Sequence, residues 1–259
     1  MKRELDTREN IKIVTSNNFI TSRGLDKLNL KERKLLYLAI SQCRQTDKGF
    51  FEYEMTVGEF AELMGIDKSN IYEEVRAITN HLFGLQIESI PKGKKEFELY
   101  TVFSKCRYNG EKIVFKLNQD MVEFLLNLHG NFTKPLLHDF LKMRSPYSMA
   151  IWHLMQREMK SKKPYADHVF EFDLSLEELR QVTGTEENYK KISHFKSRIL
   201  DKSIKDIREN CFVDILYNDV KTSRHITGFH FTARSIFYIP REKLSKHTLE
   251  TLARLENNL

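Results

Sequence analysis

Cysteine is scarce in this chain of 259 residues, and the three cysteines that it has lie far apart. Cys43, Cys106 and Cys211 are odd in number and form no CxxC pair. Zinc modules and disulfide frameworks use close, paired cysteines. We therefore expect three reduced, packed thiols, with no disulfide and no bound metal.

Long apolar runs are absent too, and so are tracts rich in proline or glycine. The chain has 5 prolines and 10 glycines, while 41% of its residues are hydrophobic and 30% are charged, which is typical of a folded globular protein. The opening MKRELDTREN lacks the apolar core of a signal peptide. No apolar run approaches the roughly 20 residues that span a bilayer. We expect a cytoplasmic protein with no membrane partner.

Sequence motifs of catalysis are also lacking. A phosphate-binding Walker loop would need a glycine five residues before Gly93, where the chain has Glu88. The nearest histidine pair, His225 and His230, falls in a strand-like segment that would place the two rings on opposite faces, unlike the metal-binding pair of nicking enzymes. No nucleophile motif is present. We expect no enzymatic activity and no cofactor.

Positive charge is in modest excess and is concentrated in the second half of the chain. The formal net charge is +6. Residues 1–133 carry 20 Lys and Arg against 19 Asp and Glu, whereas residues 134–259 carry 22 against 17. This balance favours a polyanionic partner that contacts mainly the second half.

Two short segments repeat each other at an offset of 119 residues: MTVGEFAELMG at 55–65 and LSLEELRQVTG at 174–184. Each opens with S/T-x-x-E, the capping box, in which a hydroxyl caps the helix and the carboxylate reaches back to the cap. Each ends in glycine, which supplies the left-handed position after a helix. The residues concerned are Thr56, Glu59 and Gly65 in the first copy and Ser175, Glu178 and Gly184 in the second.

A second amphipathic helix is predicted after each glycine, over 70–83 and 188–200, at an offset of 117, so the second turn is expected to be two residues shorter. A capped helix, a glycine turn and a second helix make a helix-turn-helix. The apolar positions expected to face the core are Tyr72, Val75, Ile78 and Leu82, and Tyr189, Ile192, Phe195 and Ile199.

The surrounding segments enlarge each helix-turn-helix into a winged helix. A helical pattern and a strand, GFFEYEM or HVFEFDL, precede each copy, and two extended segments broken by a polar turn follow it at 85–106 and 211–233. We predict an α+β fold of two tandem winged-helix domains, at 1–133 and 134–259, with a partly helical connection at 121–142.

The outer faces of the two second helices differ in charge. At about 100° per residue, the face opposite the core presents hydrogen-bond donors in the second copy, which suits a helix in the major groove of DNA. These donors are Lys190, Lys191, His194, Ser197 and Arg198. The first copy presents two carboxylates there, which a phosphate backbone repels. That face comprises Glu73, Glu74, Ala77, Asn80 and His81.

The predicted wing tips add further cations. Lys221 and Arg224 lie at the tip of the second wing, where a hairpin can contact a phosphate or the minor groove. The first wing is expected to carry Lys92, Lys94 and Lys95 at its tip. The alternative interpretation is a solvated basic surface without a partner.

Several blocks of the chain together resemble one family. The blocks are SNNFITS followed by LNLKERKLLYLAI, then RSPYSMAIWHLM, FDLSLEELRQVTG, YKKISHFKSRILDKSIKDIRE and ITGFHF, within residues 11–235. In this order they resemble the initiator Rep proteins of iteron-containing, theta-replicating plasmids. The resemblance implies two winged-helix domains that bind direct repeats (iterons) in double-stranded origin DNA as monomers.

The resemblance also implies roles for the two domains. The second winged helix is the main base reader, which places that role on the five donors of 190–198. The first combines homodimer contacts with auxiliary DNA contacts. Origin opening, recruitment of host replication proteins (a helicase or its loader, and the host initiator) and repression of its own promoter by dimers are implied as well. A transcriptional repressor without initiator activity and an origin-nicking enzyme remain alternatives. Residues after 235 are expected to form a C-terminal helix of unassigned role.

Overall fold

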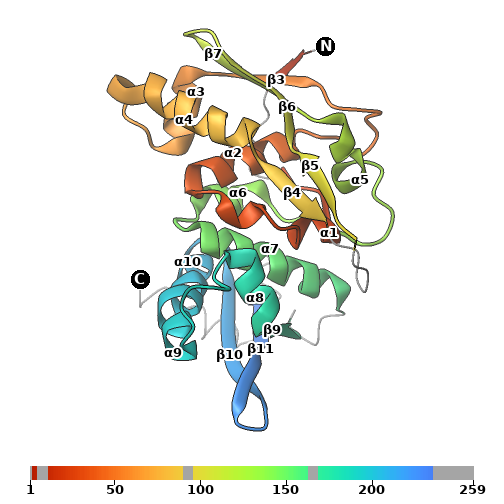
Figure 1. Ribbon diagram of the computed structural model, residues 1–259, viewed down its shortest axis with the longest axis vertical. Helices are drawn as coiled ribbons and strands as arrows, with labels where there is room; N and C mark the ends of the chain where they lie inside the picture. Colours follow the sequence, from red (N-terminus) through yellow and green to blue (C-terminus); the bar gives the residue numbers. More distant parts are fainter. Residues whose placement is uncertain (1, 5–10, 90–95, 163–168, 236–259) are drawn as a thin grey trace, which may run out of the picture.

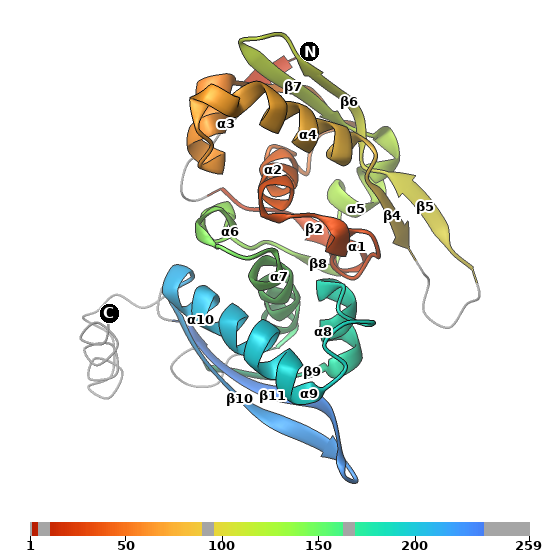
Figure 2. The ribbon, with the colours of Figure 1, turned by 60° about the vertical axis from the view of Figure 1, so that its left-hand side comes forward.

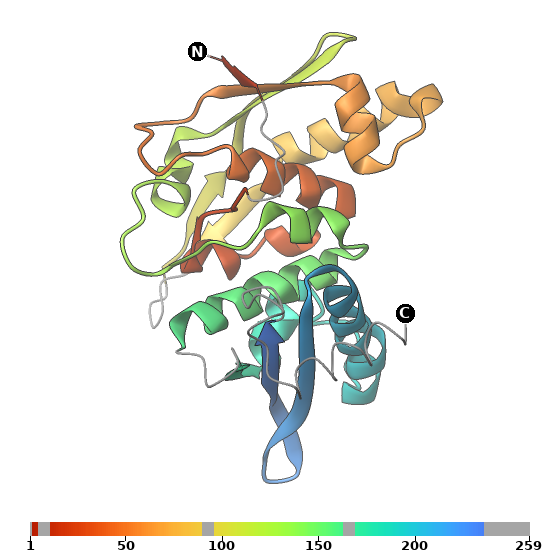
Figure 3. The ribbon, with the colours of Figure 1, turned by 180° about the vertical axis from the view of Figure 1, so that it is seen from behind.

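The computed structural model describes residues 2–4, 11–89, 96–162 and 169–235, which form two winged-helix units stacked one above the other (Figure 1). We call them the first and the second unit. The first contains strands β1 to β8, and the second begins at α7. Seen from behind, α7 lies along the boundary between them (Figure 3).

The helices of the first unit include the predicted helix-turn-helix and several shorter pieces. They are α1 (Asn17–Ile20), α2 (Leu30–Ser41), α3 (Val57–Met64), α4 (Ile71–Phe83), α5 (Val122–Leu125) and α6 (Leu137–Lys142), with 3-10 turns η1 (Leu25–Lys27), η2 (Lys68–Asn70) and η3 (Gln119–Met121). The connection at 121–142 is therefore partly helical, as predicted. The strands are β1 (Lys2–Glu4), β2 (Thr15–Ser16), β3 (Glu52–Thr56), β4 (Gln86–Ser89), β5 (Glu98–Thr101), β6 (Phe103–Tyr108), β7 (Lys112–Leu117) and β8 (Phe132–Thr133).

The second unit is more regular. Its elements are α7 (Pro146–Ser161), β9 (Val169–Ser175), α8 (Leu176–Thr183), α9 (Ile192–Phe195), the π-helical turn η5 (Lys196–Leu200), α10 (Asp201–Asn210), β10 (Val213–Thr222) and β11 (His225–Ser235). Strands β9, β11 and β10 form one antiparallel sheet in that order. The β10–β11 hairpin is the wing, and it projects away from the first unit (Figure 1).

The predicted helix starts are found in both copies, but only one capping box is complete. The Thr56 hydroxyl accepts from the Glu59 amide, and the Glu59 carboxylate accepts from the Thr56 amide at 2.7 Å. The Ser175 hydroxyl accepts from the Glu178 amide at 3.0 Å. The Glu178 carboxylate, however, pairs with Arg157 of α7 at 2.8 Å, so the reciprocal contact expected there was wrong. The Arg157 guanidinium competes for the same carboxylate.

The wing of the first unit lies later in the chain than predicted. Strand β3 pairs with β7, and β7 pairs with β6, so β6–β7 stands where the second unit has its wing. The hairpin at 85–106 is instead a separate β4–β5 pair. Its expected second strand breaks at Val102, which is buried and bonds to Leu85 and Asn118. The short apolar run in KIVFKL at 112–117, with Ile113, Val114 and Phe115 all buried, marks the strand that the sequence interpretation missed.

The two units share one hydrophobic core rather than two. A polar cluster is buried inside it, which we call the seam: His153 of α7 with Thr15, Tyr37 and Thr133 of the first unit. The His153 Nδ1 lies 3.0 Å from the Tyr37 hydroxyl, and its Nε2 lies 3.0 Å from Thr15 and 3.3 Å from Thr133. Burial lowers the pKa of His153 to about 3, so the ring is neutral and one nitrogen donates while the other accepts.

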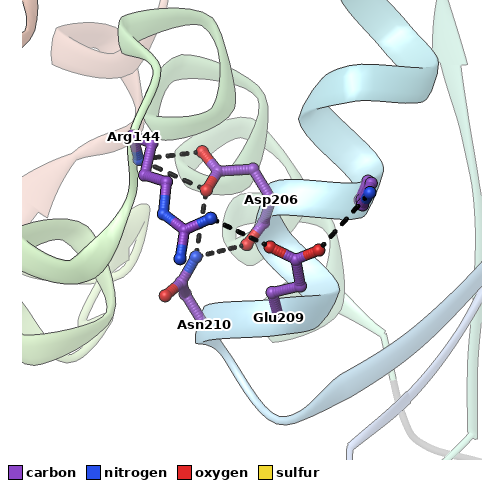
Figure 4. A network of polar contacts seen from close by, with 5 residues as sticks. Arg144, Asp206, Glu209 and Asn210 are labelled. Carbon is purple, nitrogen blue, oxygen red and sulfur yellow. Dashed lines mark hydrogen bonds and ion pairs between the residues drawn. The ribbon is translucent and has the colours of Figure 1, made fainter. Parts of the chain in front are cut away.

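A second polar network joins the end of α10 to the start of α7 (Figure 4). The Asp206 carboxylate accepts from the Arg144 amide at 3.0 and 3.2 Å, and also from the Asn210 side chain at 2.9 Å. The Arg144 guanidinium reaches Glu209 at 3.4 Å. Because Asp206 is buried, these bonds compensate the loss of its hydration and fix α10 against α7.

Candidate nucleic-acid interface

The second helix of the second unit starts later and runs further than predicted. It begins at Ile192 with Lys191 at its N-cap and continues without a break through α9, η5 and α10, since the residues at both joints are right-handed helical. The predicted span, 188–200, was therefore wrong at both ends. Tyr189, at a φ of 50°, adopts the left-handed conformation and prevents an earlier start.

A π-helical turn interrupts this helix in its middle. Such turns hold one extra residue and are frequent at functional sites. Ile199 and Leu200, both within this turn, are buried in the core. His194, Ser197 and Arg198 remain exposed on the opposite side, as the 100° pattern predicted.

Lys190 and Lys191 lie in the turn before the helix rather than on its outer face. Both are exposed, and Lys190 makes a long ion pair of 3.6 Å with Glu187, in which both side chains are largely exposed. The placement predicted for these two lysines was wrong, because the helix starts at Ile192. They nevertheless stand at its N-terminal end, the end from which recognition helices contact base edges.

Arg180 of α8 organises this turn, and sequence reasoning did not select it. Its guanidinium donates to the carbonyls of Thr185, Asn188 and Tyr189, each at 2.9 Å, and to that of Lys190 at 3.4 Å. It also lies 5.0 Å from the centre of the Phe195 ring. The sequence feature that could have indicated Arg180 is a long basic side chain one turn before Gly184, the glycine that ends α8.

Lys196 ties the helix to the wing and was also not selected. Its ammonium pairs with Asp219 of β10 at 2.7 Å and lies 5.4 Å from the centre of the Tyr217 ring. Tyr217 donates to Asp201 at the start of α10 at 2.5 Å. Burial and the neighbouring carboxylates raise the pKa of Tyr217, so the phenol keeps its proton. The helix and the base of the wing are thus held together.

The tip of the wing carries the two predicted cations. Lys221 and Arg224 are exposed. Arg224 forms the two-residue turn together with Ser223, which has a φ of 57°, and Lys221 lies near the end of β10. A register shift between Val220 and Lys221 bends the hairpin just before the tip. Figure 2 shows α8, the helix from α9 to α10 and the hairpin as one assembly at the lower end of the molecule. The cations predicted for the tip of the first wing, Lys92, Lys94 and Lys95, lie outside the described residues, and they fall between β4 and β5 in the chain rather than in the β6–β7 wing, so that placement was wrong.

The outer face of the corresponding helix of the first unit, α4, is largely as predicted, since Ala77, Asn80 and His81 are exposed, but Glu74 and Tyr72 differ. Glu74 is half-buried and pairs with Lys31 of α2 at 2.9 Å, so it faces its own unit. His81 pairs with Glu32 at 2.8 Å. Tyr72, predicted to face the core, is 52% exposed, because it packs sideways against Tyr108 of β6. Glu73 is exposed, as predicted.

The three cysteines all lie in the described ranges and form no disulfide, and burial raises the pKa of Cys106 to about 12. Among the described residues, no group of three His, Cys, Asp or Glu side chains could hold a metal ion. Within the same ranges, no helix is long and apolar enough to cross a membrane.

Comparisons with known proteins place the chain in a family. A family model described as initiator replication protein, WH1, matches residues 12–156, and one described as initiator Rep protein, WH2, matches residues 175–233. A replication initiation protein of Escherichia coli is 23% identical over 180 residues, which are 68% of this chain but only 56% of that relative.

A solved structure has the same fold. The Pi initiator protein, crystallised in complex with iteron DNA, superposes with a TM-score of 0.70 at 19% identity, over 88% of this chain and 98% of that one. The two family models match most of the chain in the order of its two winged-helix units. The chain belongs to the family of initiator replication proteins.

Proposed function

We propose that this protein is a sequence-specific initiator of plasmid replication that binds direct repeats in double-stranded origin DNA through its second winged helix. The observation that carries the proposal is the run of exposed donors from Lys190 to Arg198, at the N-terminal half of a helix that is fixed to a wing with a cationic tip. The similarity to a structure solved with iteron DNA supports the choice of DNA as partner.

Each part of the interface has a distinct task in this proposal. His194, Ser197 and Arg198 enter the major groove and contact base edges, since arginine pairs with guanine and serine and histidine bond to several bases. Lys190 and Lys191 contact base edges at the helix start. The wing tip, with Lys221 and Arg224, contacts the phosphate backbone beside the adjacent groove.

The first unit is proposed to act as an auxiliary DNA contact and as the homodimer surface, with dimers in equilibrium with monomers. Lys92, Lys94 and Lys95 stay predicted backbone contacts. The division of the chain at residue 133 likewise stays a prediction. Beyond binding, we propose origin opening, recruitment of a host helicase or its loader and of the host initiator, and repression of the protein's own promoter.

Selection from a pool of random-sequence duplexes tests the proposal. The enriched duplex should be bound with strong salt dependence: for about 6 contacted phosphates, the logarithm of the association constant falls against that of salt with a slope near −5. Tandem copies of the enriched sequence beside an A·T-rich tract, in the DNA flanking the gene, distinguish an initiator from a plain repressor. Equal binding to random duplex and a flat salt response would refute sequence-specific binding.

A further inference from the structure

Arg180 is a cation inside the candidate interface whose donors are already occupied by protein. Its two terminal nitrogens carry four N–H groups, and four backbone carbonyls of residues 185–190 accept from them. The guanidinium also stacks over Phe195, a fully buried residue of α9. Arg180 therefore bridges the end of α8, the turn and the start of the next helix, with little capacity left for a phosphate.

The first unit lacks this arrangement. Ala61, buried in the core, occupies the position that corresponds to Arg180 in the sequence repeat. The first turn, 65–70, is organised by its own elements: Asp67 caps η2 through the Ser69 amide at 2.8 Å. The second turn, 184–191, contains no helical turn, and the carbonyls of four of its residues point to Arg180 instead.

We infer that Arg180 is a positioning residue for DNA recognition: it holds the turn before the recognition helix so that Lys190 and Lys191 are presented to DNA in one fixed arrangement. This inference rests on the proposed function. A turn with exposed lysines and a left-handed Tyr189 would otherwise sample many conformations, and ordering it on binding would cost affinity. Fixing it beforehand removes that cost.

A guanidinium is needed for this task. It is planar and presents its N–H groups as a fork, whereas a lysine ammonium has three donors and no fixed plane. Lysine at position 180 would keep the charge but could not reach four carbonyls in this geometry. Arg180→Lys therefore separates the role of the fork from that of the charge, and Arg180→Ala reproduces the residue of the first unit.

The test uses the full chain, the duplex that the wild-type protein enriches from a random-sequence pool, and a scrambled duplex of equal length. Arg180→Ala and Arg180→Lys should both weaken binding to the enriched duplex, on the order of tenfold to a hundredfold for the alanine variant, and leave binding to the scrambled duplex and the salt slope unchanged. A direct phosphate contact would instead weaken both and reduce the slope by about 0.9, which would overturn the inference.

A double-mutant cycle distinguishes positioning from a general structural role. If Arg180 acts through Lys191, the variant carrying Arg180→Ala and Lys191→Ala should lose less specific affinity than the two single losses combined. Additive losses would contradict the inference. Ser175→Ala is the matched control: it weakens the opposite end of α8 and should leave specific binding unchanged, so a loss there would attribute the effect to helix stability.

Failure of the inference and of the proposed function give different results. A wild-type protein that enriches no duplex refutes both. A wild-type protein that enriches a duplex, with Lys191→Ala impaired and both Arg180 variants unimpaired, refutes only the positioning role.

Discussion

The two winged-helix units begin their helix-turn-helix alike and diverge in the turn. Both first helices are capped by a hydroxyl at the N-terminus, and both stop at a left-handed glycine, Gly65 or Gly184. The second helix then starts at Ile71 in the first unit but only at Ile192 in the second, four positions later in the repeat. The second turn is thus longer, although the sequence offset of 117 predicted that it would be shorter.

The reversed charges favour this difference. Glu73 and Glu74 lie in the first turn of α4, where carboxylates interact favourably with the positive end of the helix dipole. The corresponding lysines, Lys190 and Lys191, would be unfavourable in a first turn. The helix therefore starts after them, and Arg180 takes up the carbonyls that the missing turn leaves. Lysines at these two positions thus suit contact with DNA but are unfavourable in the first turn of a helix.

The largest expected effect tests whether the two units are one body. His153→Ala removes the centre of the seam and leaves the Thr15, Tyr37 and Thr133 hydroxyls buried without their partner, which should lower the free energy of unfolding by about 3 kcal/mol. Thermal unfolding should stay a single transition at lower temperature. The exposed His129→Ala is the control, with a change within about 0.5 kcal/mol.

Two separate transitions in the wild-type protein would show that the units fold independently and would contradict a shared core. The pH dependence adds a second measurement. The pKa of His153 is about 3 in the folded state against 6.5 when unfolded, so the unfolded state binds more protons between these values. The wild-type protein should therefore lose stability through His153 as pH falls below 6.5. The stability of His153→Ala should depend less on pH over that range.

Asp139 of α6 gives the opposite pH response at the same boundary. Burial raises its pKa to about 7, while Trp152 and Lys142 act against the shift. Stability from this group is present below about pH 4 and is lost as pH rises toward 7, since the folded carboxyl holds its proton longer. Asp139→Asn should stabilise the protein at pH 8 by roughly 1 to 3 kcal/mol and flatten this part of the profile in chemical denaturation. Destabilisation of the variant at pH 8 would show that the ionised form is required.

Substitutions at the exposed cations of the second unit should change DNA affinity rather than stability. Arg198→Ala or Lys191→Ala should weaken binding to the enriched duplex by about 1 to 3 kcal/mol if the side chain makes a bidentate base contact, and should relax preference at one base position. A phosphate contact would weaken all duplexes alike. Unfolding should change by less than about 0.5 kcal/mol, because both side chains are exposed. Unaltered affinity in both variants would remove the second unit as the base reader.

The parts of the fold that sequence could predict are those with local signals. The caps at Thr56 and Ser175 and the two glycine stops are set by neighbouring residues, and they were found where expected. Pairing of distant segments was harder. The choice of β6–β7 over β4–β5 as the wing depends on which hairpin reaches β3, a contact that no local pattern encodes.

The same distinction applies to the candidate interface. The exposure of His194, Ser197 and Arg198 follows from helical periodicity, so it could be predicted. Arg180 and Lys196 could not be recognised, because their importance comes from carbonyls and a carboxylate that only the folded chain brings near. A basic residue that is paired inside an interface and one that is free to bind look alike in sequence.

The smallest expected effect concerns the first unit and is the sharpest test of the charge contrast. Of the two glutamates, only Glu73 is a clean probe, because Glu74→Ala also breaks the ion pair with Lys31. Glu73→Ala should leave specific binding unchanged or slightly tighter, since it removes a repulsion rather than a contact, and should cost a few tenths of a kcal/mol of stability through the helix dipole.

Footprinting of Glu73→Ala beside Arg198→Ala decides between the units. If Glu73→Ala loses preference at a cytosine, the carboxylate accepts from the base amino group and α4 itself reads DNA. If it loses preference while Arg198→Ala keeps it, the roles assigned to the two units are reversed. An unchanged footprint for Glu73→Ala, with a footprint of Arg198→Ala relaxed at one position, leaves the second unit as the reader, because its helix presents exposed donors and is tied by an ion pair to a wing with a cationic tip.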